Sequence, residues 1–482
     1  MQTEIFVGQN KLQNLSSEPV QGNYVSLFGN DFYCIRNYDQ MPPFFMSIVS
    51  SSDHWIFISS TGGLTAGRTN AESALFPYYT DDKITENYQN TGSISVLQVK
   101  RNQKTYLWEP FTPRYFNIYK IERNLYKHVF GNQLMFEEIN HDLQITFRTL
   151  WQTSEKFGFA KTSWAINTSD SPCSVNLVDG LQNILPYGAT TALQTTFSNL
   201  LNAYKRNELD PQTGLGIFAL SSTLSDLAEP SESLKATTVW QTGLDHPTYL
   251  LSTSQLNAFR VGKDITPEID VRGQRGAYLV NTNSELLPFS ELKWTMVAEV
   301  NQDGTSVANL KKRLEQESTS LVTDLITDID QCTADLRRIV ANADGLQISS
   351  DRQSSVHHFS NVLFNTMRGG IFADNYTLDK NDLLDFINVR NKSVLHQYAT
   401  FFSALPKEIS YNDLISGAEA ANTSGDLLRL CYEYLPLTFS RRHGDPSRPW
   451  NKFSINLKKP DGSKRLEYQG NWRDIFQNWE PL

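Results

Sequence analysis

The chain has 482 residues, 39% of them hydrophobic and 12% aromatic, which predicts two or three folded domains and argues against a disordered protein. Its 43 basic and 52 acidic residues give a formal net charge of −9, so we expect no nucleic-acid partner. No uncharged apolar run approaches the roughly 18 residues that span a bilayer, so no membrane partner is expected either.

The cysteines and the N-terminus indicate a reducing compartment. The four cysteines form no CxxC pair and predict neither a disulfide framework nor a zinc site; they are Cys34, Cys173, Cys332 and Cys431. The first residues carry no basic stretch followed by an apolar one, so a cytoplasmic protein is predicted. The adjacent pair His357 and His358 would point about 100° apart on a helix and could not share a metal. We therefore predict no metal and no cofactor.

The first three hundred residues have the pattern of β-strands. Short runs of β-branched and aromatic residues are separated by Gly, Asn, Asp and Pro, as at 45–49, 55–58, 143–147 and 159–166. Such runs predict a large antiparallel β-sandwich over residues 1–303. The stretch 187–234 is less regular, and we interpret it as a long excursion packed on the sandwich.

Helical spacing begins near Gly304. Apolar residues four or seven apart predict a helical linker over 304–345, either one helix or two with a break near Ile329. Helical patterns at 357–368, 394–402 and 426–435 then predict α-hairpins over residues 346–482. The fold class is therefore α+β and multidomain: a sandwich, a helical linker and the start of an (α/α) toroid.

Two polar, aromatic segments near the C-terminus have the composition of a sugar site. The first runs from Arg441 to Asn451 and the second from Gly470 to Glu480. Arg and Asp can bond sugar hydroxyls in pairs, while Trp offers an apolar face to a pyranose ring. The alternative is a surface loop followed by an amphipathic helix. His443 could likewise be a sugar or phosphate ligand, or bond within its own loop.

The segment 470–478 resembles a motif of the glycoside phosphorylases of glycoside-hydrolase family 94, which act on cellobiose, chitobiose and related β-glucans. Their toroid carries a Gly-aromatic-Arg-Asp-x-x-Gln-Asp run that grips the non-reducing sugar. The resemblance implies that Arg473 and Asp474 bond hydroxyls and that Gln477 supports them. Asn478 stands where the family has a second Asp. The substrate-binding residues that we expect are Trp472, Arg473, Asp474, Gln477, His443, Asp445, Trp450, Asn451 and Arg68.

Two further segments, 62–68 and 74–83, look like the sandwich loops of a divergent phosphorylase-like branch. Arg68 lies in the first of them, where it either faces the toroid or is a surface residue. The Gly62-Gly63 pair has neither the G-x-G-x-x-G spacing nor a following helix, so a plain loop is expected there.

The resemblance also predicts where the catalytic acid lies. In family 94 the general acid is an Asp well downstream of the sugar-gripping motif, so no catalytic residue is predicted here and the acid is expected beyond Leu482. The chain looks like the N-terminal half of such an enzyme, with inorganic phosphate as a possible co-substrate.

Two classes of function remain open. One is a glycoside phosphorylase or hydrolase acting on β-linked oligosaccharides. The other is a non-catalytic carbohydrate-binding or assembly protein. The expected partners are an oligosaccharide and either a second copy of the chain or a separate C-terminal half.

Overall fold

The computed structural model describes residues 4–12, 18–115, 117–224, 233–421, 425–442, 444–448 and 450–470. The chain divides into two compact units. The sandwich unit comprises residues 1–336 with Gly444–Lys452, and the helical unit comprises 337–443 with 453–482.

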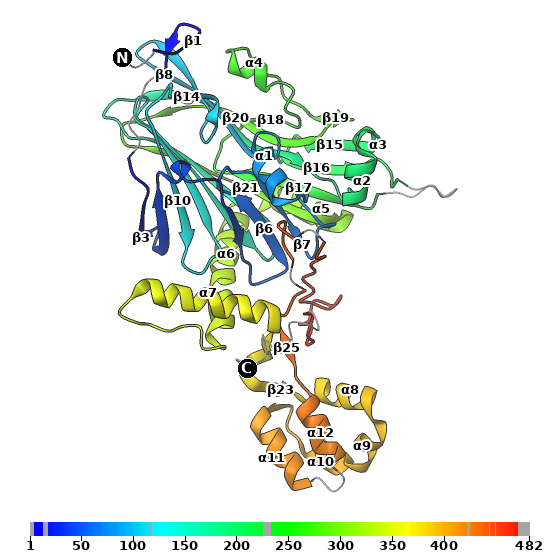
Figure 1. Cartoon of the computed structure of the whole chain (residues 1–482). Helices are drawn as coiled ribbons and strands as arrows, with labels where there is room; N and C mark the ends of the chain where they lie inside the picture. The colour runs from blue at the N-terminus through cyan, green and yellow to red at the C-terminus, as the bar shows by residue number, and fades with distance from the viewer. Residues whose placement is uncertain are drawn as a thin grey trace. The chain divides into compact units, whose positions relative to one another are not determined.

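The sandwich unit is built on two antiparallel sheets (Figure 1). The larger one has eleven strands in the order β19 (Asp270–Arg272), β15 (Lys205–Asp210), β16 (Leu215–Leu220), β17 (Lys235–Thr242), β21 (Glu291–Asp303), β13 (Gly158–Asn167), β12 (Ile145–Ser154), β11 (Leu134–Asn140), β10 (Ile121–His128), β4 (Asn30–Arg36) and β3 (Gln21–Leu27). The smaller one has five strands in the order β18 (Thr248–Leu250), β20 (Gly276–Leu286), β14 (Cys173–Ile184), β8 (Gly92–Arg101) and β9 (Lys104–Trp108).

Smaller elements complete this unit. A three-stranded sheet is formed by β5 (Phe45–Ile48), β6 (His54–Ser59) and β7 (Leu64–Arg68), and β1 (Phe6–Val7) pairs with β2 (Asn10–Lys11). The short helices are η1 (Tyr38–Gln40), α1 (Asp81–Glu86), η2 (Asn87–Gln89), η3 (Pro113–Tyr115), α2 (Thr191–Thr196), α3 (Ser198–Tyr204) and α4 (Leu256–Arg260). Every strand pairing that the structure describes is antiparallel, which confirms the predicted antiparallel β-sandwich.

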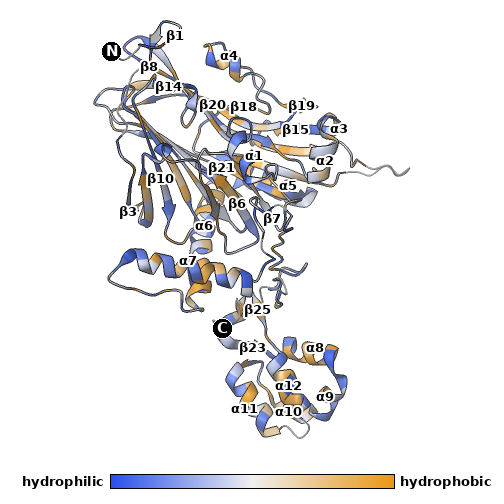
Figure 2. Cartoon of the chain, in the orientation of Figure 1, coloured by the Kyte–Doolittle hydropathy of each residue, from blue (hydrophilic) through white to orange (hydrophobic). Residues whose placement is uncertain are grey.

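The core of this unit takes side chains from both large sheets. On β12, Ile145, Phe147 and Trp151 alternate with residues that face the other way, and all three belong to the main apolar cluster. Leu97 of β8 and Leu177 of β14 join them from the smaller sheet. Figure 2 shows apolar and polar residues mixed along the strands of this unit. A period of two along a strand is the direct cause, because alternate side chains point to opposite faces.

One expectation about this unit is wrong. The stretch 187–234 was interpreted as an irregular excursion, but β15 and β16 within it pair with β19 and β17 in the larger sheet. The buried positions of β15 are Lys205, Asn207 and Leu209. Two of these three side chains are polar, so the strand carries no apolar alternation that could be recognised in the sequence.

Helices α5 (Gly304–Gln316) and α6 (Ser318–Ala341) follow β21. The Asp303 carboxylate caps α5 by accepting the Ser306 N–H at 2.8 Å, as an N-cap residue does. The break falls at Glu317 and not near Ile329 as the sequence suggested. Leu321 and Leu325 of α6 pack in one apolar cluster with Trp240 and Val297 of the larger sheet.

The helical unit contains α7 (Arg352–Gly369), β22 (Ile371–Phe372), η4 (Ala373–Tyr376), β23 (Thr377–Asp379), α8 (Lys380–Arg390), α9 (Lys392–Gln397), α10 (Ala399–Ala404), β24 (Glu408–Ser410), α11 (Tyr411–Ala421), α12 (Asp426–Glu433) and β25 (Leu437–Thr438). Helix α7 ends at Gly369, and Gly370 follows with φ 83°, a conformation that favours glycine. Strand β22 pairs with β25, and β23 with β24.

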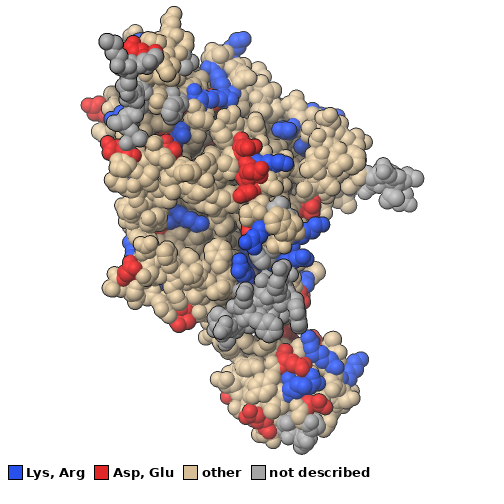
Figure 3. Space-filling view, viewed as in Figure 1, with Lys and Arg blue, Asp and Glu red and all other residues tan. Residues whose placement is uncertain are grey.

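Acidic and basic side chains are interspersed among the described residues on the face that Figure 3 shows. None of the helices that the structure describes is long and apolar enough to cross a membrane.

Candidate functional site

The motif loop, Gly444–Lys452, is a succession of tight turns. The Asp445 carboxylate accepts the Ser447 N–H at 2.8 Å and also the Ser447 hydroxyl. The Asp445 carbonyl accepts the Arg448 N–H at 2.9 Å, and the Arg448 carbonyl accepts the Asn451 N–H at 2.9 Å. Asp is favoured in such turns because its side chain can bond the backbone two residues further on. The loop is therefore held by its own residues.

The motif loop lies against segment 74–83 of the sandwich unit, one of the two segments that resemble sandwich loops of the phosphorylase-like branch. The Asp81 N–H, at the first residue of α1, donates to the carbonyl of the buried residue Pro446 at 3.3 Å. Burial, together with the negative charge of Asp445, raises the pKa of Tyr78 above its ordinary value. The structure thus brings together segments 74–83 and 444–452, which are far apart in the sequence.

Within the motif loop, one aromatic side chain is free to meet a ligand. Trp450 is 75% exposed, and Asn451, whose N–H closes the last turn, follows it. An exposed indole face costs solvation free energy unless something covers it, and the C–H face of a sugar ring is one chemical match. Asp445 is half-buried.

Arg68 makes three contacts with the protein itself. Its guanidinium forms ion pairs with Asp53 at 2.8 Å and with Glu299 at 2.7 Å, and donates to the Glu155 carbonyl at 3.3 Å. The carboxylate of Glu299 is 8% exposed, and its burial raises its pKa to about 7 although Arg68 opposes that shift. Within the described part of the chain, no hydrogen bond or ion pair joins Arg68 to the motif loop. Its role as a sugar ligand stays a prediction.

The Gly62-Gly63 turn has a packing reason. A Cβ on Gly63 would lie 2.0 Å from the Ile84 carbonyl oxygen of α1, so only glycine lets the turn and this helix meet. Gly62 has φ 91°, in the left-handed region. The turn therefore seats α1, and α1 in turn carries the contact to the motif loop.

Five of the predicted substrate-binding residues lie outside the residues that the structure describes; they are His443, Trp472, Arg473, Asp474 and Gln477. Their grouping with Asp445, Trp450 and Asn451 in one pocket stays a prediction. Within the described part of the chain, no group of three or more His, Cys, Asp or Glu side chains could hold a metal ion.

The sandwich unit contains a pocket that was not predicted from the sequence. Its polar lining residues come from separate strands and loops, among them Ser95, Glu109, Thr149 and Arg260. One signal was available: in the alternating run Ile145, Phe147, Thr149, Trp151, a threonine occupies a core-facing position. The other residues have no common spacing, so nothing local in the sequence links them.

Comparison with known families gives one match, to the helical unit. Residues 372–436 match the model described as glycoside hydrolase family 149 insertion domain 1. The match relates this segment to a glycoside hydrolase family and does not single out family 94. The segment begins and ends at a strand pair, with Phe372 of β22 opposite Leu437 of β25, so the chain enters and leaves it side by side.

This segment also has a core of its own. The buried apolar residues of this core lie between Leu378 and Tyr434 and include Leu383, Leu414 and Leu427. The helices of residues 372–436 were predicted to be the first hairpins of a toroid. The matching model describes them as an insertion domain. The assignment of residues 346–482 as a whole to a toroid stays a prediction.

Solved structures give low similarity scores. A bacterial glucoamylase in complex with acarbose is 10% identical with a TM-score of 0.36, and the match covers 78% of this chain and 54% of that one. A protein from the human microbiome assigned as a kojibiose phosphorylase is 13% identical with a TM-score of 0.32, over 61% of this chain and 36% of that one. These scores are too low to carry an argument about function. No curated protein sequence matches the chain.

Proposed function

We propose that the chain is a carbohydrate-active protein of the glycoside phosphorylase or hydrolase type that acts on β-linked oligosaccharides. The match of residues 372–436 to an insertion domain of glycoside hydrolase family 149 carries this proposal. Support comes from the structure of that segment, because a body with its own core and paired ends has the construction expected of an insertion.

The motif loop and the C-terminal motif supply the proposed sugar contacts. Trp450 would cover the C–H face of a ring, and Arg473 with Asp474 would bond its hydroxyls in pairs. Trp472, Gln477, His443, Asp445 and Asn451 would complete the site. In an inverting reaction an acid protonates the glycosidic oxygen while phosphate or water attacks the opposite face of the sugar. We assign no catalytic acid to the described residues.

A specific observation favours the non-catalytic alternative, a carbohydrate-binding or assembly protein. Two of the predicted ligands are already bonded to protein groups: Asp445 to Ser447 in its turn, and Arg68 to Asp53 and Glu299. Side chains used in this way stabilise loops whether or not chemistry occurs there. A cytoplasmic location, and a partner that is a second copy or a separate C-terminal half, stay proposals under both functions. So does the closer relation to family 94.

Titration with cellobiose by calorimetry tests the site. We expect Arg473→Ala to weaken binding about tenfold to a hundredfold, because a charged hydrogen bond contributes roughly 1.5–3 kcal/mol. Trp450→Ala should also weaken binding, with little effect on the melting temperature because the side chain is 75% exposed. Arg429→Ala, which removes an exposed arginine on α12, is the matched control and should bind cellobiose normally. Equal binding by all of these proteins would remove both residues from the site.

Turnover separates the two functions. Release of glucose 1-phosphate from cellobiose in phosphate buffer would indicate a phosphorylase, and release of glucose alone a hydrolase. Binding that Arg473→Ala weakens, without turnover in either buffer, would favour the binding or assembly protein.

A further inference from the structure

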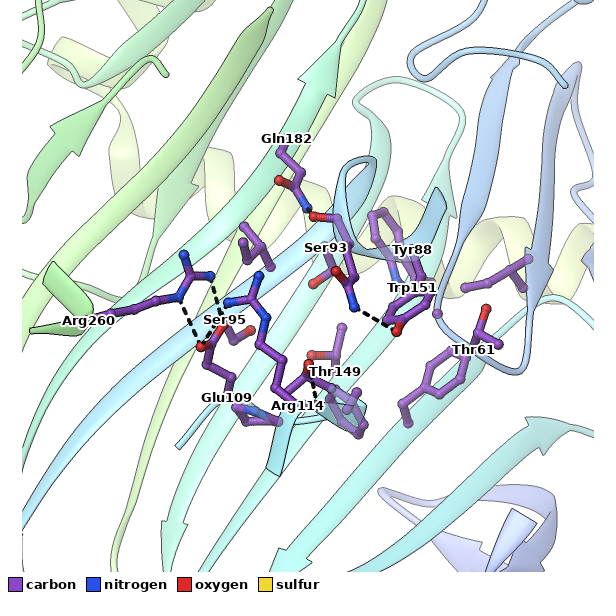
Figure 4. A pocket seen from close by; sticks show the side chains of 18 residues that line it. Thr61, Tyr88, Ser93, Ser95, Glu109, Arg114, Thr149, Trp151, Gln182 and Arg260 are labelled. Atoms are coloured by element: carbon purple, nitrogen blue, oxygen red, sulfur yellow. Dashed lines mark hydrogen bonds and ion pairs between the residues drawn. The ribbon is translucent and has the colours of Figure 1, made fainter. Parts of the chain in front are cut away.

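The pocket inside the sandwich unit lies between its two large sheets (Figure 4). Strand β8 and Gln182 of β14 line it from the smaller sheet, and β11 and β12 line it from the larger one. Its lining residues are Ile58, Thr61, Gly62, Tyr88, Gln89, Ser93, Ile94, Ser95, Glu109, Pro110, Phe111, Thr112, Arg114, Phe136, Thr149, Trp151, Gln182 and Arg260. None of them belongs to the motif loop.

Polar side chains occupy positions in this pocket that the strand pattern directs toward the core. On β8, Ser93 and Ser95 precede Leu97 at every second residue, and Leu97 is in the main apolar cluster. On β12, Thr149 stands between Phe147 and Trp151, which belong to the same cluster. Alternate residues of a strand share one face, so these hydroxyl groups replace apolar groups at the end of the core.

One of these hydroxyl groups is buried without a partner. Thr149 is 3% exposed, and its Oγ1 atom has no hydrogen-bond partner among the described residues. A buried hydroxyl that makes no hydrogen bond destabilises the fold, because it has lost its bonds to water without replacing them. The neighbouring pocket residue Ser95 donates its proton to Asp179 at 2.6 Å, so toward the pocket its oxygen can only accept. Together the two residues offer one donor and two acceptors to a ligand.

An ion-pair cluster of Glu109, Arg114 and Arg260 forms one side of the pocket. Arg260 donates to both oxygens of the Glu109 carboxylate, at 2.9 and 2.8 Å, and its third nitrogen bonds Asn257. Burial alone would raise the pKa of Glu109. The hydrogen bonds and charge of Arg260, the hydrogen bond from Tyr115 and the charge of Arg114 together lower that pKa below its ordinary value. Glu109 is therefore ionised at neutral pH. Arg114 Nη1 also lies 3.4 Å from its carboxylate, so two guanidinium groups outweigh the single negative charge, which disfavours a cationic ligand.

Aromatic rings form the opposite side. Tyr88 of η2 and Trp151 of β12 lie near each other across the pocket from Glu109 (Figure 4). The segment that carries Tyr88 is held in place: Gln182 donates to the Gln89 carbonyl at 2.9 Å, and the Gln89 side chain donates to the Tyr88 hydroxyl at 2.8 Å. Ring faces beside hydroxyl groups are the combination that recognises a pyranose.

We propose that this pocket is a second carbohydrate site, one that binds a single neutral sugar ring. Its hydroxyl groups would bond Thr149 Oγ1 and Ser95 Oγ, and its C–H face would lie on the ring of Tyr88, since Trp151 is 1% exposed and belongs to the core. The pocket shares no residue with the motif loop, so the proposal does not depend on the reaction proposed above.

Thr149→Val tests it in the full chain, with glucose as the probe. Valine keeps the shape and the strand propensity of threonine and removes only the hydroxyl. The unliganded variant should melt at the same temperature as wild type or higher, because an unpartnered buried hydroxyl is gone. Its affinity for glucose at this site should fall about tenfold, as expected for one lost hydrogen bond. Hydrogen exchange read by peptide should show glucose protecting residues 88–95 and 145–151 in wild type and not in the variant.

Two threonines provide matched controls. Thr238 of β17 is 1% exposed and its hydroxyl also lacks a partner, but it does not line the pocket. Thr238→Val should therefore leave glucose binding unchanged. Thr162 bonds Thr295 at 2.9 Å, so Thr162→Val should lower stability and also leave binding unchanged.

Three results would overturn the proposal. They are no glucose protection of these peptides in wild type, equal protection in Thr149→Val, or protection by glucose 6-phosphate and not by glucose. If the Thr149 hydroxyl bonds only water, glucose should not protect these peptides in wild type. Loss of cellobiose binding in Arg473→Ala with these peptides still protected would separate this site from the motif site.

Discussion

Several ionisable side chains of the sandwich unit are buried, and burial shifts the pKa of each. His128 is 4% exposed, and burial lowers its pKa to about 4. Lys127 donates to the Ser47 carbonyl at 2.8 Å, and burial lowers its pKa to about 8. Glu299, beside Arg68, is shifted in the opposite sense because burial disfavours a negative charge. Such residues make stability depend on pH.

The Glu299 carboxyl leads to a prediction about that dependence. Its pKa is raised from 4.5 to about 7 in the folded chain, so between these values the folded state holds a proton that the unfolded state has released. The free energy of unfolding must then fall as pH rises through this window, by roughly 3.5 kcal/mol at most. Glu299→Gln does not titrate and should lose less stability over the same window.

Urea unfolding of both proteins at about pH 5 and about pH 8 measures the difference. His128 contributes the opposite slope, since its pKa is lowered, but it does so in both proteins and cancels in the comparison. Parallel stability profiles for wild type and Glu299→Gln would show that Arg68 keeps this carboxylate ionised across the whole range.

At the scale of elements, a buried ion pair joins the two large sheets. Asp179 of β14 and Lys161 of β13 are both fully buried, with Lys161 Nζ 2.7 and 2.8 Å from the two carboxylate oxygens. The Trp294 indole of β21 donates to Asp179 at 2.7 Å, and Ser95 of β8 donates at 2.6 Å. Four strands from two sheets therefore converge on one carboxylate.

Breaking this pair should be more damaging than replacing it. Lys161→Met leaves Asp179 charged in the core, so we expect a loss of about 3–5 kcal/mol in the free energy of unfolding. Asp179→Leu should cost a similar amount because it strands the ammonium. The double variant should cost clearly less than the sum, since it removes both charges together. Additive losses, measured by urea unfolding, would mean that the two groups do not stabilise each other.

A contact between α1 and the motif loop also joins distant segments of the chain. Asp81 at the start of α1 bonds Pro446, while the far end of the same segment carries Tyr88 and Gln89 into the sandwich pocket. The Gly63 turn lets α1 pack closely enough for both. One short segment thus contacts both candidate sugar sites.

At the scale of the whole molecule, the chain has at least one part built to fold by itself. Residues 372–436 have their own apolar core, and the β22–β25 pair joins their two ends. We expect residues 370–439, expressed alone, to unfold cooperatively on heating, although a domain of this size is only marginally stable.

Core variants of that fragment test this expectation. Leu414 and Leu427 are fully buried, so Leu414→Ala or Leu427→Ala should cost about 2–5 kcal/mol and leave the fragment unfolded. Val389 is 80% exposed, so Val389→Ala should not change the melting temperature. A fragment without a cooperative transition would show that its core needs the rest of the chain.

The sequence by itself determined what depends on neighbouring residues. Runs of β-branched and aromatic residues such as 159–166 predicted strands, and the spacing of Leu321 and Leu325 predicted a helix. Each is a local property, because side-chain direction repeats every 2 residues in a strand and every 3.6 in a helix.

Only the tertiary structure decided what depends on residues far apart. The order of the eleven strands, the union of Lys161 with Asp179, and the meeting of Asp81 with Pro446 all join distant segments. The sandwich pocket has the same origin, since Thr149 of β12 and Ser95 of β8 line one pocket only after two sheets have packed. Pairing partners are selected by burial and hydrogen bonding in the assembled core, and no spacing along the chain records that selection.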